Sequence, residues 1–142
     1  MILLDVNVLV YSHRQDGIDF VKYRDWLRDY SEKSTFAVAD IILSGYLRIL
    51  THPKIFNPPT PPDIAWRSVE QLRSHPHAAW IAPGPGHWAI FKGLCEAAGA
   101  KGNLVPDAYI AALAIEHGLE LLTTDRDYAR FPGLKWRHPL VA

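Results

Sequence analysis

The sequence predicts an α/β fold in which a mostly parallel sheet of four or five short strands carries helices on both faces. Three observations favour this fold. Short apolar runs alternate with amphipathic segments along the whole chain, glycine and proline mark the boundaries between them, and no internal repeat interrupts the order. The chain has 142 residues, 49% of them hydrophobic and 21% charged, which suits one ordinary domain. We therefore expect a single domain over residues 1–142.

The expected strands are the short apolar runs. The first, Ile2–Leu4, is apolar throughout, as in a strand that is buried on both faces, and it ends at Asp5. The later runs are expected at 35–38, 80–82, 119–123 and 134–136.

The expected helices lie between these strands. Residues 18–30 place aromatic and leucine side chains at helical spacing, with charged residues on the opposite face. Asp40 is placed to cap a helix that runs to Leu50. The segment 52–62 holds five prolines and is expected to be a loop. The remaining helices are expected from Pro61 to near Ser74, from 87 to a stop at Gly99, from Pro106 to a cap at Gly118, and as a short turn near Tyr128.

The composition excludes several classes of protein. Lys plus Arg and Asp plus Glu both total 15, so the chain lacks the broad basic coat of a nonspecific nucleic-acid binder. The single cysteine, Cys95, excludes an intramolecular disulfide framework and a multi-cysteine zinc site. No stretch has the length and apolarity of a signal peptide or a spanning helix. We therefore expect a soluble, cytoplasmic protein without a membrane partner.

Several aspartates are placed where parallel strands end. Asp5 follows the first expected strand, Asp40 the second, and Asp125 and Asp127 the fourth, while Asp107 opens the helix that leads into the fourth strand. Ligands of such sheets bind beyond the carboxyl ends of the strands. Two carboxylates about 4 Å apart repel by roughly 4 kcal/mol at an effective dielectric constant near 20, so a proton or a cation must neutralise them. Oxygen ligands favour Mg²⁺ or Mn²⁺.

Each of these acids also has a purely structural interpretation. Asp5, Asp40 and Asp125 could each cap a helix or a turn, and Asp107 could compensate a helix dipole. The joint placement of the acids at strand ends and at one helix start favours the metal site over four separate caps.

Motifs around these acids occur in a characteristic order. They are LLDVNVLVY (3–11), LSGYLRIL (43–50), FKGLCEAAGAKGNLVPDAY (91–109), LVPDAYIAALAIEHG (104–118) and LLTTDRDYARF (121–131). At these motifs the sequence resembles the PIN domain, and more closely the VapC-type toxins of bacterial toxin–antitoxin pairs. The resemblance spans roughly residues 2–137. It implies a three-layer α/β/α PIN-like fold around the predicted sheet.

By position, the resemblance implies that Asp5 and Asp107 are the two principal Mg²⁺ ligands, with Mn²⁺ able to substitute. Asp125 matches a further catalytic and metal-binding acid after the fourth strand. Asp127 matches an acid that often precedes an aromatic residue there, and the resemblance leaves open which of these two reaches the metal.

Asn7 and Thr123 match polar positions that support the ligands. The chain departs from the family at one place: the helix after the second strand usually carries a Glu, whereas residues 43–46 contain no acid. Asp40, one turn upstream, is the only nearby substitute. Either Asp40 reaches the site, or the site has one carboxylate fewer, which would weaken a second metal position.

The activity implied by the resemblance is Mg²⁺-dependent endoribonuclease action by the toxin of a type II toxin–antitoxin system. Attack of water on an RNA phosphodiester would leave 5′-phosphate and 3′-hydroxyl ends. The resemblance also implies a VapB-type antitoxin partner and a homodimer. The basic residues nearest to the proposed site in sequence, and so the candidate RNA contacts, are Arg14, Arg48, Lys101 and Arg126.

Two other functions stay open at this point. A haloacid-dehalogenase-type phosphohydrolase also begins with a strand that ends in Asp and uses Mg²⁺, but that family requires Asp-x-Asp, and here the second position is Asn7. A catalytically weak module that binds an antitoxin and regulates an operator is the other possibility, because the family Glu is missing.

Overall fold

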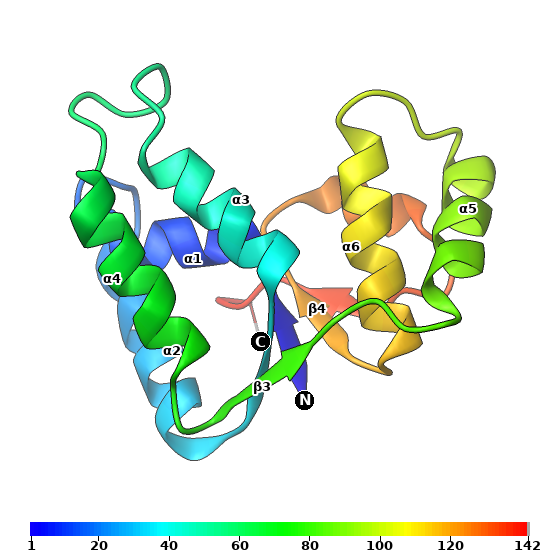
Figure 1. Ribbon diagram of the computed structural model, residues 1–142, viewed down its shortest axis with the longest axis horizontal. Coiled ribbons are helices and arrows are strands. Elements are labelled where there is room, and N and C mark those ends of the chain that lie inside the picture. The colour runs from blue at the N-terminus through cyan, green and yellow to red at the C-terminus, as the bar shows by residue number, and fades with distance from the viewer. Residues whose placement is uncertain (142) are drawn as a thin grey trace.

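A five-stranded, entirely parallel sheet forms the centre of the computed structural model, which describes residues 1–141 (Figure 1). The order of the strands across the sheet is β3-β2-β1-β4-β5. Their bounds are β1 Ile2–Leu4, β2 Phe36–Ala39, β3 Ala78–Ile81, β4 Glu120–Leu122 and β5 Trp136–Arg137. The prediction of an α/β fold with a mostly parallel sheet of four or five short strands is confirmed.

Helices flank this sheet on both sides. In Figure 1, α1, α2 and α4 lie to its left, and α5 and α6 lie to its right. The helices are α1 Val6–His13, α2 Phe20–Lys33, α3 Asp40–Leu50, α4 Pro62–Arg73, α5 His87–Ala98 and α6 Leu104–Glu116, and a 3₁₀ turn, η1, covers Arg126–Arg130. Among residues 1–141, none of the helices combines the length and the apolar character that a membrane crossing requires.

The core lies against the middle of the sheet. Leu3 in β1 is fully buried and pairs with Ala37 on one side and Leu121 on the other. This central place explains why the sequence of β1 is apolar without alternation, since both of its faces are covered by helices. Gly45 allows α3 to approach α1 closely, because a Cβ atom there would lie 3.0 Å from Val6 Cγ2.

Element boundaries differ from the predicted ones at a few positions. Helix α6 begins at Leu104, two residues before Pro106, because the first turn of a helix leaves its N–H groups unpaired and therefore accepts proline. Strand β3 begins two residues before Trp80. Helix α5 ends as predicted, with Gly99 in the left-handed conformation at a φ of 60°.

The prediction that Asp40 caps a helix is wrong. Asp40 is already the first residue of α3, and the capping position is Ala39, which makes no side-chain hydrogen bond. The side chain of Asp40 is 63% exposed and accepts a hydrogen bond from Arg73 Nε at 3.2 Å. It therefore neutralises a charge on α4 instead of closing the helix end.

Candidate active site

The carboxyl ends of the two central strands β1 and β4 place Asp5 and Thr123 beside each other. Leu4 pairs with Leu122 in the sheet, and the N–H of Asp5 donates to the carbonyl oxygen of Leu122 at 2.9 Å. One residue further on, the Thr123 hydroxyl donates to Asp5 Oδ2 at 2.7 Å. Thr123 is fully buried and Asp5 is 5% exposed. The parallel register thus fixes one carboxylate at the edge of the sheet.

Asp5 also caps helix α1, as one of its structural interpretations predicted. Its Oδ1 accepts a hydrogen bond from the N–H of Val6 at 2.8 Å. An ionised carboxylate offers about four lone pairs, and the bonds from Val6 and Thr123 use only two of them. The cap and a cation can therefore share this side chain.

Asp125 is tied to the same threonine and caps the 3₁₀ turn η1. Its N–H donates to Thr123 Oγ1 at 3.0 Å, and its Oδ1 accepts from the N–H of Asp127 at 2.9 Å. Asp125 lines the same pocket as Asp5, whereas Asp127 is exposed and does not line it. Of the two acids that the sequence left undecided, the structure brings Asp125 to the pocket.

The third carboxylate comes from the first turn of α6. Asp107 is half-buried, and its Oδ1 accepts a hydrogen bond from the Tyr128 hydroxyl at 3.4 Å. Tyr128 itself is 1% exposed. The sequence analysis placed Tyr128 in a turn and gave it no role in the site. A tyrosine that follows an acid at the end of a strand could have indicated one, because a buried phenol requires a hydrogen-bond partner.

One open pocket of roughly 590 Å³ collects these side chains. The acids that line it are Asp5, Asp107 and Asp125, and Asn7 lies among them. Its other walls come from α3, α5 and α6, and the polar or aromatic residues there are Ser44, Arg48, Phe91 and Tyr109. The rings of Phe91 and Tyr109 pack edge to face with centroids 5.4 Å apart. Apart from Arg48, these wall residues were not identified from the sequence.

Burial and electrostatic repulsion in this pocket both raise the pKa values of its acids. Burial, followed by the charges of Asp125 and Asp5, raises the pKa of Asp107 to about 6. Burial likewise raises the pKa of Asp5, against the hydrogen bonds from Thr123 and Val6. The pocket therefore favours either a proton or a cation between its carboxylates.

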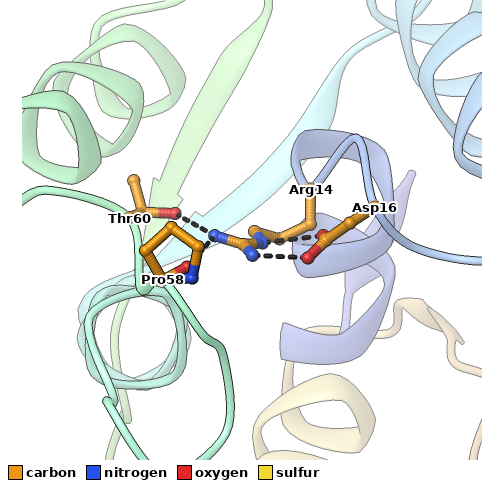
Figure 2. Close-up of polar contacts among 4 residues, drawn as sticks. All are labelled: Arg14, Asp16, Pro58 and Thr60. Carbon is orange, nitrogen blue, oxygen red and sulfur yellow. Dashed lines mark hydrogen bonds and ion pairs between the residues drawn. The ribbon is translucent and has the colours of Figure 1, made fainter.

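Arg14, a candidate RNA contact, does not line the acidic pocket. Figure 2 shows its contacts with Asp16, Pro58 and Thr60 instead. Its guanidinium donates to Asp16 at 2.9 and 2.6 Å, to the carbonyl oxygen of Pro58 at 3.1 Å and to Thr60 Oγ1 at 3.3 Å. It also lies 4.1 Å from the centre of the Phe56 ring. Only 12% of its side chain is exposed, so Arg14 joins the end of α1 to the proline-rich loop.

The other candidates divide in the same way. Arg48, near the end of α3, lines the acidic pocket. Lys101 and Arg126 are exposed and do not line it. Asp40 lines a separate groove together with Arg73 and does not line the acidic pocket. Of the two alternatives left open by the sequence, the structure therefore shows the one with one carboxylate fewer.

The donor set fits a hard divalent cation. All the charged groups that line the pocket, apart from Arg48, are carboxylates, and lone pairs of Asp5 and Asp107 remain free of hydrogen bonds within residues 1–141. In this part of the chain no three His, Cys, Asp or Glu side chains are grouped to hold one ion together. Mg²⁺ is commonly held by one or two carboxylates and several waters, so two aspartates suffice.

A model of the PIN domain matches residues 2–134. The chain belongs to the PIN domain family. The resemblance seen in the sequence motifs is thereby confirmed, and a haloacid-dehalogenase-type phosphohydrolase is excluded. PIN-domain nucleases of the VapC type depend in general on a divalent metal.

Curated relatives and solved structures agree with this assignment. The chain is 40% identical over 141 residues to "VapC ribonuclease Mb2897" of Mycobacterium bovis, covering 99% of this chain and 96% of that protein. It is 36% identical over 142 residues to "Ribonuclease VapC25" of Mycobacterium tuberculosis, covering 99% and 100%. Its fold is similar to that of VapBC2 from Rickettsia felis, solved with a DNA fragment from its promoter, with a TM-score of 0.72 at 21% identity, covering 97% and 98%.

Residues 43–46 of α3, where the resemblance in the sequence motifs implies an acid, contain none. From that stretch Ser44 and Gly45 line the pocket, and neither can replace a carboxylate. The pocket of this chain therefore holds three aspartates, and its α3 wall contributes a hydroxyl and the Arg48 guanidinium instead of a further negative charge.

Proposed function

We propose that this chain, as a single PIN domain over residues 1–142, is a cytoplasmic VapC-type toxin that hydrolyses RNA phosphodiester bonds with Mg²⁺. Residue 142 lies outside the described residues. The relatives that are 36 to 40% identical are named ribonucleases. The observation that carries the proposal is the convergence of Asp5, Asp107 and Asp125 on one pocket, where burial and the charges of Asp125 and Asp5 raise the pKa of Asp107.

Asp5 and Asp107 would hold the metal, and Asp125 would complete the negative side of the pocket. Mg²⁺ or Mn²⁺ suits this oxygen-only set. When bound, such a cation supplies Lewis acidity toward a phosphoryl oxygen and toward the attacking water.

Neighbouring groups set the positions of these carboxylates. The buried Thr123 hydroxyl holds Asp5 Oδ2, and the Tyr128 hydroxyl holds Asp107 Oδ1. Burial and the charges of Asp5 and Asp107 raise the pKa of Tyr128 far above its usual range, so the phenol stays protonated and donates. With both acids held in place, the chain has little reorganisation left to make when the reaction begins.

The walls of the pocket suit an RNA strand. Arg48 supplies the positive charge at the pocket, where it can pair with a phosphate. Phe91 and Tyr109 offer aromatic surface on which a base can stack. Hydrolysis by water leaves a 5′-phosphate and a 3′-hydroxyl and needs no attack by the ribose 2′-hydroxyl.

Because the α3 acid is absent, the site favours one metal over two. Two aspartates balance the charge of one hydrated divalent cation, and Asp125 adds a third carboxylate. A second cation would lack a carboxylate on the α3 side, where Ser44 stands. The same feature favours a second candidate function, in which the chain binds its antitoxin and regulates an operator with little catalysis. Mg²⁺ binding without RNA turnover at any Mg²⁺ or Mn²⁺ concentration would favour that candidate.

The partners proposed are the RNA substrate, a VapB-type antitoxin and a second copy of this chain. Solved structures with this fold include a VapBC pair and the "Toxin-antitoxin complex from Klebsiella pneumoniae". An antitoxin segment that covers the acidic pocket would place an Arg or Lys opposite Asp5 and Asp107, since an unpaired pocket of carboxylates attracts a positive charge.

The test is expression of the chain alone, followed by sequencing of new RNA 5′ ends. Asp5→Asn and Asp107→Asn should abolish cleavage while circular dichroism stays that of the wild type. Asp63→Asn, an exposed acid of α4, makes the same charge change outside the pocket and should cleave normally. Cleavage that persists in EDTA, or in both pocket variants, contradicts the proposal.

A further inference from the structure

A second cavity lies between helices α2 and α4 and shares no lining residue with the acidic pocket. Its volume is roughly 260 Å³. In Figure 1 the two helices lie on the same side of the sheet. We call this cavity the α2–α4 cleft. Its polar lining residues are Arg24, Arg28 and Ser31 from α2, Ser68, Gln71 and His75 from α4 and the turn after it, Ser12 and His13 from α1, and Tyr46 from α3.

Two arginines line this cleft, and no carboxylate lines it. Arg24 and Arg28 stand one turn apart on α2, an arrangement of like charges that destabilises a helix. Arg24 Nε donates to the exposed Asp25 at 3.1 Å, while Arg28 has no ion-pair partner within residues 1–141. Amphipathic helices that are meant to pack together present apolar residues to each other. Besides Leu27 and Leu72, these two helices present donors to each other, so an anion between the donors would remove the repulsion.

His75 adds a donor whose direction is fixed by the backbone. Its Nδ1 accepts a hydrogen bond from the N–H of His77 at 2.9 Å. In the neutral ring the proton must then be on Nε2, which makes that nitrogen a donor. The ring packs against Phe36 with centroids 5.2 Å apart, so it is held in this orientation.

A hydroxyl pair at the base of the cleft supplies another free hydrogen. The hydroxyls of Tyr46 and Ser68 lie 2.7 Å apart, and one of them donates to the other. The second hydroxyl hydrogen has no acceptor among the described residues and can donate to a ligand. Tyr46 is 1% exposed, so its hydroxyl is held by the packing around its ring.

An apolar floor accompanies the donors. Leu27, Phe36 and Leu72 line the same cleft. This combination of charged donors and an apolar floor suits a phosphate ester that carries a planar ring. The volume of roughly 260 Å³ lies just below the usual range for ligand pockets, which is roughly 300 to 1,000 Å³, so part of the ligand would stay in solvent. We propose that the α2–α4 cleft binds a nucleotide, with its phosphate between Arg24, Arg28 and His75 and its base on the apolar floor.

Binding is measured on the metal-free full chain in EDTA, so that the result does not depend on the nuclease activity. The probes are adenosine monophosphate, adenosine, inorganic phosphate and a 5′-phosphorylated tetraribonucleotide, titrated by calorimetry. Adenosine monophosphate should bind saturably, and adenosine at least about tenfold more weakly, because charge-assisted hydrogen bonds are lost. The Nε2 resonance of His75 should shift in ¹⁵N spectra as the monophosphate binds.

Matched variants separate the cleft from the charge of α2 in general. Arg24→Gln/Arg28→Gln should weaken binding of adenosine monophosphate at least about tenfold. Lys22→Gln/Lys33→Gln removes two positive charges from the same helix outside the cleft. This variant should change the affinity for adenosine monophosphate by less than about twofold. Thermal melts verify that both variants fold.

The outcomes are distinct. If the tetranucleotide binds more tightly than the monophosphate, the ligand of the cleft is the end of an RNA strand. If it binds equally or more weakly, the ligand is a free nucleotide. Either result supports the proposal that the cleft binds a nucleotide. The proposal fails if no probe binds saturably, if the two double variants lose affinity equally, or if a glutamate-rich peptide binds where the monophosphate does not.

Discussion

Replacing Asp107 by asparagine should stabilise the metal-free protein, although it removes a residue of the proposed active site. Burial and the charges of Asp125 and Asp5 raise the pKa of Asp107 from 3.8 to about 6. That difference corresponds to at most about 3 kcal/mol of unfolding free energy. Because water reaches this half-buried group and screens it, we expect about 1 to 2 kcal/mol. Asparagine keeps an oxygen that can accept from Tyr128 but carries no charge.

The pH dependence follows from the direction of this pKa change. Below pH 3.8 the carboxyl of Asp107 is protonated in both the folded and the unfolded chain. Between that pH and about 6 the unfolded chain loses the proton first, so the folded state becomes progressively less stable as the pH rises. The advantage of Asp107→Asn should therefore be smallest near pH 4 and reach its full size above about pH 6.

The assay is thermal unfolding in EDTA across this pH range, repeated with Mg²⁺. At neutral pH the melting temperature of Asp107→Asn should exceed that of the wild type by roughly 3 to 8 °C. Mg²⁺ should raise the melting temperature of the wild type but not that of the variant, while Asp63→Asn should behave as the wild type. A variant that is no more stable than the wild type at neutral pH, or a difference that does not vary with pH, would refute the reasoning.

Three further substitutions test the supporting contacts. Thr123→Val removes the donor to buried Asp5, so it should cost about 1 to 3 kcal/mol of stability in urea unfolding and weaken Mg²⁺ binding. Thr123→Ser keeps the hydroxyl and should restore both. Wild-type Mg²⁺ affinity in the valine variant would contradict the role of Thr123 in positioning Asp5. Tyr128→Phe keeps the packing and removes the hydrogen bond to Asp107. The Mg²⁺ affinity measured by calorimetry should therefore fall about three- to tenfold, while the circular dichroism spectrum stays unchanged. Equal affinity in the variant and the wild type argues against a role of Tyr128 in positioning Asp107. Arg14→Ala should lower stability by about 1 to 2 kcal/mol and leave RNA cleavage per folded molecule unchanged. Loss of cleavage without loss of stability would instead indicate that Arg14 contacts the RNA.

Much of the fold could be predicted because its signals are local. The apolar run Ile2–Leu4, the stop at Gly99 and the proline-rich 52–62 segment each reflect the conformational preferences of the residues themselves. Alternation of strands and helices then requires parallel pairing, which places the strand ends at one edge. That is why Asp5 and Asp125 could be assigned to one pocket before their side chains were seen.

Other features depended on packing between distant segments. Asp40 and Asp5 both follow a strand directly, yet Asp40 turns to Arg73 on α4 while Asp5 is buried beside Thr123. Arg14 is near Asp5 in sequence, but its guanidinium binds the loop around Pro58.

The amino-acid sequence by itself determined the order of the elements, the family and the acids that belong to strand ends, since these follow from residue type and spacing. Only the tertiary structure decided which of those acids share a pocket, that Tyr128 reaches Asp107, and that Arg24 and Arg28 face a cleft. The direction of a side chain at the end of a strand or on a helix is set by what packs against it, and those partners lie far away along the chain.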